Sequence, residues 1–122
     1  MTKANFREWF TSSGSRVLAG KSAENNEELI AQVEKSETVL HTAKPGSPFV
    51  NIKIKKPSKQ DIYDAAVFCA KHSQDWRDNK GSVKVHVFKG SAVFKEKRMK
   101  TGTFGVKKFK EIIAKKGDIL KI

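Results

Sequence analysis

The sequence is poor in cysteine and in acidic residues, and it has no long apolar run. Cys69 is the single cysteine of 122 residues, so an internal disulfide is excluded and a reducing compartment is expected. No stretch approaches the roughly 20 apolar residues of a membrane span, and the N-terminal segment MTKANFREWF lacks the apolar core of a signal peptide. These absences predict a soluble, cytoplasmic protein with no membrane partner.

The patterns of catalytic, metal and nucleotide sites are also missing. The three histidines and the cysteine show no paired ligand spacing, which argues against a metal site. The segment SGSRVLAGKS resembles a phosphate-binding P-loop, but one residue too many separates Gly14 from Gly20. No two carboxylates are placed as a general acid and base. We therefore expect a domain that is not an enzyme and needs no cofactor.

Positive charge is the strongest global feature. The chain has 25 Lys and Arg against 13 Asp and Glu, a net charge of +12. From Lys80 to Ile122, thirteen basic residues stand against three acidic ones, so this part carries ten of the twelve net positive charges. Such an asymmetry indicates a polyanionic partner. The alternative is an adaptation to heat or salt that places many lysines on the surface.

Hydrophobic periodicity predicts a single α+β domain over residues 1–122, with a mostly antiparallel sheet and two main helices. Turn residues, such as those in TSSGS and KPGS, separate the expected strands. Strands are expected over 6–10, 16–20, 38–42, 49–54, 82–90, 91–95 and 103–109, and helices over 24–35 and 61–76.

Helix signals predict the start of both helices. Asn25 is the expected N-cap of the first helix, with Glu28 at N3. Ser58 and Asp61 form an expected capping box before the second helix, whose small residues suggest close packing on a sheet. Cys69 lies on the apolar face of this helix and is expected in the core.

Alternation predicts which side chains the strands bury. In 49–54, Val50, Ile52 and Ile54 are expected inside, with Asn51 and Lys53 in water. In 82–90, the three valines are expected inside and the residue that follows each of them, Lys84, His86 and Phe88, outside.

A group of motifs surrounds the turn LHTAKPGSPF. AGKSAENNEELI fits the spacing G-K-x-x-x-x-N-[DE]-x-L, and VLHTAKPGSPFVNI adds an L-H-T strand end and a P-G-S turn. This order of motifs resembles the NFACT-R domain, the RNA-binding module of the NFACT family, which includes RqcH and proteins labelled fibronectin-binding protein A. The matching positions are Gly20, Lys21, Asn26, Glu27, Leu29, Leu40, His41, Thr42, Pro45, Gly46 and Ser47.

The resemblance extends from about Phe10 to about Ile113. IYDAAVFCAKHSQDW is similar to the family's EEAA…YSKAW helix, and KTGTFGVKKF to its closing hairpin. The loop between Thr42 and Pro45 is one residue shorter than the bacterial form, and Pro48 replaces a common histidine. The large N-terminal domain and coiled-coil arms of full-length members are not in this sequence. The resemblance therefore implies a standalone NFACT-R protein without tail-elongation activity.

The expected binding residues combine cations for phosphates with aromatic and polar groups for bases. The basic segments KEKRMK and VKKFK supply cations, His86 and Phe88 lie between lysines as stacking groups, and the P-G-S turn presents a polar edge. Two alternatives stay open: Phe88 is buried under a helix, or His41 only bonds a neighbouring backbone group. The candidate residues are Lys21, His41, Thr42, Lys44, Lys84, His86, Phe88, Lys89, Lys95, Lys97, Arg98, Lys100, Lys107, Lys108 and Lys110.

Charge and resemblance together predict a non-catalytic module that docks electrostatically on structured RNA, either tRNA or rRNA, with the ribosome as a further expected partner. DNA is an alternative ligand. A second hypothesis is an adaptor that docks on a ribosomal or other protein. The sequence carries no indication of an oligomeric state.

Overall fold

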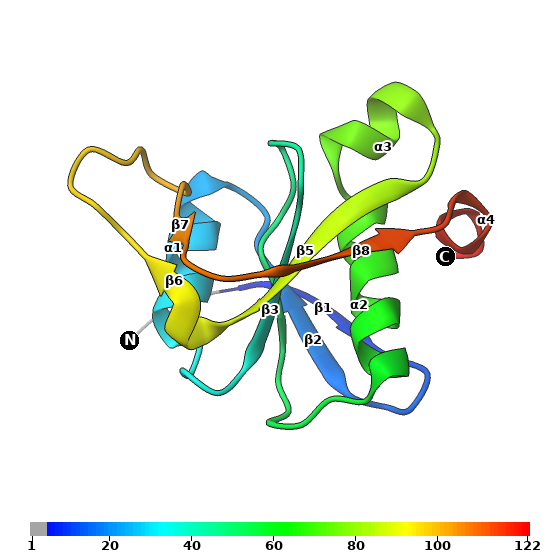
Figure 1. Ribbon diagram of the computed structural model, residues 1–122, viewed down its shortest axis with the longest axis horizontal. Coiled ribbons are helices and arrows are strands. Elements are labelled where there is room, and N and C mark those ends of the chain that lie inside the picture. Colours follow the sequence, from blue (N-terminus) through cyan, green and yellow to red (C-terminus); the bar gives the residue numbers. More distant parts are fainter. Residues whose placement is uncertain (1–4) are drawn as a thin grey trace.

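The computed structural model of the protein describes residues 5–122. It contains a six-stranded sheet, whose arrangement is shown in Figure 1. The strands lie in the order β1-β2-β4-β3-β5-β8, and every neighbouring pair is antiparallel. A separate hairpin pairs β6 with β7. The expected α+β class with an antiparallel sheet is confirmed. The strands are β1 (Arg7–Phe10), β2 (Arg16–Ala19), β3 (Thr38–Thr42), β4 (Val50–Ile52), β5 (Val83–Lys89), β6 (Val93–Phe94), β7 (Gly105–Val106) and β8 (Lys110–Ala114).

Two main helices cover the sheet, as predicted, and two short ones follow them. The main helices are α1 (Ala23–Gln32) and α2 (Lys59–Lys71); the short ones are α3 (Gln74–Asn79) and α4 (Lys116–Leu120). None of the helices found between residues 5 and 122 combines the length and the apolar character that a membrane-spanning helix needs.

The capping box predicted for α2 is confirmed, because the Ser58 side chain accepts from the Asp61 N–H and the Asp61 side chain accepts from the Ser58 N–H. The cap predicted for α1 was wrong. Ser22 is the N-cap, since its Oγ accepts from the Asn25 N–H, and the Asn25 side chain instead accepts from the N–H of Lys21. Ala23 and Glu24 have good helix propensity, so the helix begins earlier than Asn25.

The helix expected over 61–76 is interrupted, because Ser73 starts a new one. The Ser73 hydroxyl donates to the carbonyl of Ala70 at 2.7 Å and accepts from the N–H of Trp76 at 3.2 Å. A serine that bonds nearby backbone groups competes with the helix in this way. Trp76 consequently belongs to α3, although it is buried in the core as its spacing predicted.

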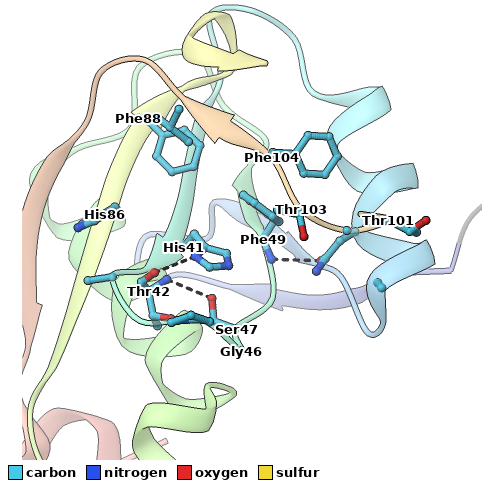
Figure 2. Close-up of a pocket in the computed structure, with 16 residues that line it drawn as sticks. His41, Thr42, Gly46, Ser47, Phe49, His86, Phe88, Thr101, Thr103 and Phe104 are labelled. Atoms are coloured by element: carbon cyan, nitrogen blue, oxygen red, sulfur yellow. Dashed lines mark hydrogen bonds between the residues drawn. The ribbon is translucent and has the colours of Figure 1, made fainter. Parts of the chain in front are cut away.

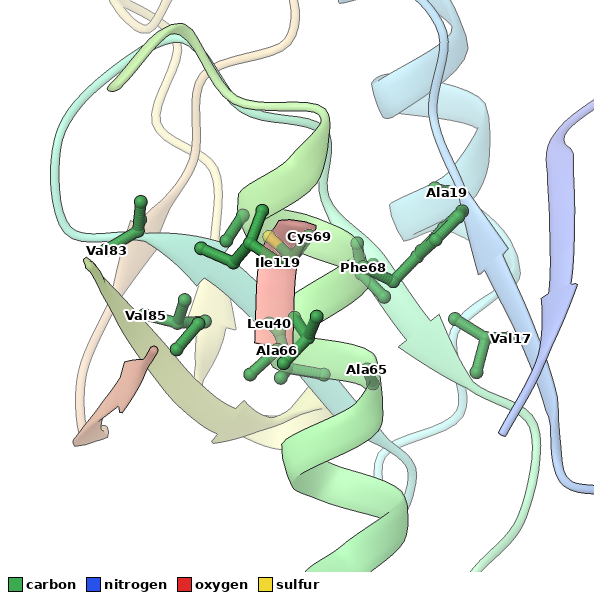
Figure 3. Close-up of a cluster of buried hydrophobic side chains, with 14 of the residues drawn as sticks. Val17, Ala19, Leu40, Ala65, Ala66, Phe68, Cys69, Val83, Val85 and Ile119 are labelled. Carbon is green, nitrogen blue, oxygen red and sulfur yellow. The ribbon is translucent and has the colours of Figure 1, made fainter. Parts of the chain in front are cut away.

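α2 packs on one face of the sheet through small side chains (Figure 3). Ala65, Ala66 and Cys69 are fully buried there, so the helix backbone approaches the strands closely. Burial raises the pKa of the Cys69 thiol to about 12, which keeps it protonated and unreactive. The expectation that Cys69 belongs to the core is confirmed.

α1 and the β6–β7 hairpin cover part of the opposite face (Figure 1). Leu18, Val39 and Phe88 project from the sheet into this second core, where Leu29 of α1 meets them. The prediction that Phe88 lies on the wet side of β5 was wrong: its side chain is 5% exposed. Alternation assigned it to the correct face, but this face is covered as well.

The same covering layer explains the errors in β4. Asn51 is fully buried, and its amide donates to the carbonyl of Thr38 at 3.2 Å and accepts from Gln32 of α1 at 3.0 Å. Lys53 pairs with Glu37 at 2.8 Å. The strand ends at Ile52, so Ile54 lies outside the sheet and is 39% exposed. Strand β8, which forms an edge of the sheet beside β5, was not predicted.

Candidate functional site

A hollow lies on the sheet face that α1 and the hairpin cover only in part. We call it the central pocket; its volume is about 530 Å³. His41 of β3 and His86 of β5 are directly paired across the strands on its floor, beside Phe49 and Phe88. The first turn of α1, the P-G-S turn and the loop 101–104 also line it (Figure 2).

His41 presents a hydrogen-bond acceptor in this pocket. Its Nδ1 lies 2.8 Å from the carbonyl oxygen of Thr42, which only accepts, so Nδ1 carries the proton. Nε2 has no partner in residues 5–122, and no buried side-chain nitrogen or oxygen there is left unpaired, so Nε2 is reached by solvent. Burial lowers the pKa of His41, which keeps the ring neutral at pH 7. The ring also packs on Phe49 with a centroid distance of 4.5 Å.

Thr42 and the P-G-S turn have a positioning role. Thr42 is 1% exposed; its hydroxyl donates to the carbonyl of Lys44 at 2.6 Å, and its N–H donates to Ser47 Oγ at 3.1 Å. Gly46 has φ +91°, and its carbonyl accepts from the N–H of Gln74 at 2.8 Å. A Cβ at Gly46 would lie 2.8 Å from Gln74 Cβ, so only glycine lets α3 approach this turn.

The first turn of α1 is joined to the sheet by Asn26. Its Oδ1 accepts from the N–H of Phe49 at 3.2 Å, which ties the helix to the strand that follows the P-G-S turn. A Cβ at Gly20 would lie 1.9 Å from the same oxygen. Gly20 therefore makes room for the Asn26 side chain.

Glu27 ties the hairpin loop to α1. Its carboxylate accepts from Lys95 Nζ and from the N–H of Gly102, both at 2.7 Å. The bond from Lys95 contributes most, and the bond from Gly102 next, to a pKa of Glu27 that lies below its usual value. Lys95 also donates to the carbonyls of Lys100 and Thr103. Lys95 was expected to bind phosphate, but these contacts occupy its ammonium group, so its role in this structure is to fold the loop.

The other cations of the hairpin loop are exposed. No carboxylate of residues 5–122 lies within ion-pair distance of Lys97, Arg98 or Lys100. We call these three residues the loop cations. Each is four residues or fewer from Thr101, which lines the central pocket. The loop that carries these cations therefore leads directly into the wall of the pocket.

The remaining candidate cations are spread over several surfaces. Lys44 lies 3.7 Å from Asp75 and is 66% exposed in its side chain. Lys21 does not line the central pocket but lies in a depression next to it. The others are exposed on or near β5 and β8: Lys84, Lys89, Lys107, Lys108 and Lys110.

Phe88, the aromatic residue expected from the sequence to stack on a base, is not exposed. Phe88 lines the pocket floor, but its side chain is almost completely buried, so its ring face is not free to stack on a base. His86 instead stacks on Phe109 at 4.0 Å and lies 3.1 Å from a Glu111 oxygen. Phe109 is 49% exposed and follows two lysines in VKKFK, a local signal that sequence reasoning missed.

The pocket thus combines aromatic edges, one neutral acceptor nitrogen and nearby free cations, which suits binding of a flat polar ring with a phosphate backbone. Within residues 5–122, no three histidine, cysteine, aspartate or glutamate side chains are grouped to hold a metal ion.

A family model described as the NFACT protein RNA binding domain matches residues 5–108. The chain belongs to the NFACT-R family. The motif residues of this NFACT-R domain lie close together in space, and Asn26, Gly46 and Gly102 line the central pocket. Gly20 leaves room for the Asn26 side chain, and Glu27 accepts a hydrogen bond from Gly102. The resemblance seen in the sequence is confirmed.

Two relatives of this NFACT-R domain are informative. It is 30% identical over 90 residues to the archaeal Rqc2 homolog aRqcH of Methanocaldococcus jannaschii, a match that covers 71% of this chain and 13% of the relative. Its fold is similar to the C-terminal part of the fibronectin/fibrinogen-binding protein from Streptococcus suis, with a TM-score of 0.85 and 20% identity, covering 100% of this chain and 50% of that one. The chain therefore spans a small part of its curated relative.

Proposed function

We propose that this NFACT-R domain binds structured RNA, either tRNA or rRNA, in ribosome-associated quality control. The family description as an RNA-binding domain supports the ligand class, and the likeness to an archaeal Rqc2 homolog supports the cellular setting. The domain acts as a binding module, and no catalytic step is assigned to it.

The three loop cations carry this proposal. They are exposed and unpaired among residues 5–122, and the Glu27 bonds fix their loop against the wall of the central pocket. Exposed cations on this loop bind the phosphates of an RNA backbone, and the pocket that the same loop lines at residues 101–104 accepts less regular parts of the RNA. Neutralising about five phosphates gives a slope of log K against log salt of roughly −4 on a duplex.

Fluorescence anisotropy tests the assignment. The ligands are tRNA, an rRNA hairpin, single-stranded DNA and heparin, each at three salt concentrations. The triple variant Lys97→Ala, Arg98→Ala, Lys100→Ala is expected to lose most RNA affinity and to show a shallower salt slope. Lys95 is left unchanged because it folds the loop.

The matched control removes the same charge elsewhere, through Lys115→Ala, Lys116→Ala and Lys121→Ala. These residues lie at and around α4, which Figure 1 shows on the opposite side of the molecule from the β6–β7 loop. Equal losses in the two triple variants would mean that net charge alone attracts RNA. Binding of heparin as tight as that of RNA would reduce the site to a general basic surface.

A protein-docking function has one observation in its favour. Strand β8 is an edge of the sheet, and Phe109 and Ile113 at this edge are 49% and 53% exposed. Exposed apolar residues on an unpaired strand edge suit pairing with another chain. A ribosome interaction that survives nuclease treatment and high salt, and that Ile113→Lys abolishes, would favour this second function.

A further inference from the structure

A second hollow adjoins the central pocket. We call it the basic pocket; its volume is about 310 Å³. Its cationic and titratable lining residues are Arg7 from β1, Lys21 before α1, His72 at the end of α2 and Arg77 from α3, and the P-G-S turn also lines it. Only Lys21 was a candidate from the sequence.

The basic pocket has positive charge without a counter-ion. No carboxylate is among the residues that line it, and none of residues 5–122 forms an ion pair with Arg7, Lys21 or Arg77. Burial, followed by the charges of Arg7, Lys71 and Arg77, lowers the pKa of His72. Guanidinium groups recognise phosphate with paired hydrogen bonds. An anion of phosphate type therefore fits this hollow.

The two pockets share one wall. Ala23, Asn26, Gly46 and Ser47 line both of them. The Oδ1 of Asn26 accepts a hydrogen bond from the N–H of Phe49. Its Nδ2 has no hydrogen-bond partner in the described chain and is reached by solvent. The Asn26 amide is thus a free hydrogen-bond donor between the central pocket and the basic pocket.

The central pocket has the complementary chemistry for a base. Phe49 and Phe104 meet edge to face at 5.3 Å on its wall, and His41 Nε2 accepts a hydrogen bond. A volume of about 530 Å³ is in the range of small-ligand sites. A paired base in a helix cannot enter such a hollow, but an unpaired one can.

We infer that the domain recognises one unpaired nucleotide of its RNA, with the base in the central pocket and the adjoining phosphate in the basic pocket. This inference rests on the proposed function, because the loop cations bring the RNA to the site. The sugar lies over the shared wall, where the Asn26 amide donates to it.

Two RNA hairpins of equal length and charge test the inference. One is fully paired, and the other carries a single bulged nucleotide. The domain is expected to bind the bulged RNA about tenfold more tightly, since stacking and one phosphate contact are added. The double variant Arg7→Gln, Arg77→Gln is expected to lose this preference and to keep its affinity for the paired hairpin. Lys55→Gln, Lys56→Gln, at exposed positions of the β4–α2 loop, is the matched control and retains the preference.

A second measurement needs no variant. In amide NMR spectra, a nucleoside monophosphate is expected to shift resonances of both pockets, inorganic phosphate those of the basic pocket alone, and the nucleoside those of the central pocket alone. Equal affinity for the two hairpins, or shifts spread over the whole surface, would overturn the inference while RNA binding stands. Failure to bind either hairpin would overturn the proposed function itself.

Discussion

The tether between Glu27 and the hairpin loop gives the sharpest test of how the site is built. Glu27→Gln removes the charge that accepts from Lys95 Nζ and the Gly102 N–H. Hydrogen bonds to charged groups contribute about 1.5–3 kcal/mol each, and the side chains of Lys95 and Glu27 are 32% and 33% exposed, so solvent weakens their bond. We therefore expect the two bonds together to stabilise the closed loop by about 1–3 kcal/mol. Glu27→Gln removes this stabilisation from the loop rather than from the whole fold.

Hydrogen exchange of the Gly102 amide measures this loss directly. Its protection factor is expected to fall about 5- to 150-fold, which is the same free energy expressed as an opening equilibrium. RNA affinity is expected to fall as well, because the loop that carries the loop cations is no longer held against α1. Glu34→Gln is the control: it removes the same negative charge just beyond α1, and among residues 5–122 no hydrogen bond or ion pair joins the Glu34 carboxylate to the hairpin loop. Unchanged protection at Gly102 would refute the tether.

The tether also predicts a pH dependence with a defined sign. The pKa of Glu27 is lowered in the folded protein, so the tether is fully present above the usual value near 4.5 and is lost as the pH falls through the lowered value. Protection of Gly102 in the wild type should therefore decrease selectively under acidic conditions. In Glu27→Gln this selective decrease should be missing.

Two further predictions concern the elements that hold the site. Gly46→Ala is expected to lower the Tm of thermal unfolding by about 5–10 °C, because its φ is positive and its new Cβ would lie 2.8 Å from Gln74. Gly14→Ala is the control and should lower Tm less, since its φ is also positive but its Cβ would meet nothing within 4 Å. Asp61→Ala removes the acceptor of the Thr11 and Ser13 hydroxyls, the first causes of its low pKa of about 2. We expect a loss of about 1–3 kcal/mol in chemical unfolding at pH 7 that shrinks as the pH falls from 3.8 towards 2, and a loss equal at both pH values would contradict the pairing.

Local signals in the sequence predicted the local structure well. The alternating valines of β5, the capping box of α2 and the Pro-Gly turn after β3 each depend on residues only a few positions apart. Periodicity also separated the two faces of β5 correctly. It could not reveal that both faces are covered, and this is why Phe88 and Asn51 were expected in water.

The candidate site was harder to predict because its parts meet only in the folded chain. Glu27 and Lys95 are 68 positions apart, so nothing local distinguishes Lys95 from the free cations that follow it. Arg7 and Arg77 lie in segments without a binding motif, and only the complete fold brings β1 and α3 to the same pocket. The motifs of the resemblance were the better guide, since Asn26, Gly46 and Gly102 all reached the central pocket.

The hairpin loop has a practical consequence for engineering. It is joined to the domain through the two-residue strands β6 and β7 and through the Glu27 tether, and the α2 side of the sheet is independent of it. Residues 96–100 can therefore be exchanged as a cassette, with Lys95 on one side and the pocket-lining segment that starts at Thr101 on the other retained as its fixed ends. A library varied in this segment alone is expected to change whatever RNA affinity the loop cations supply, while the packing of α2 on the sheet stays unchanged.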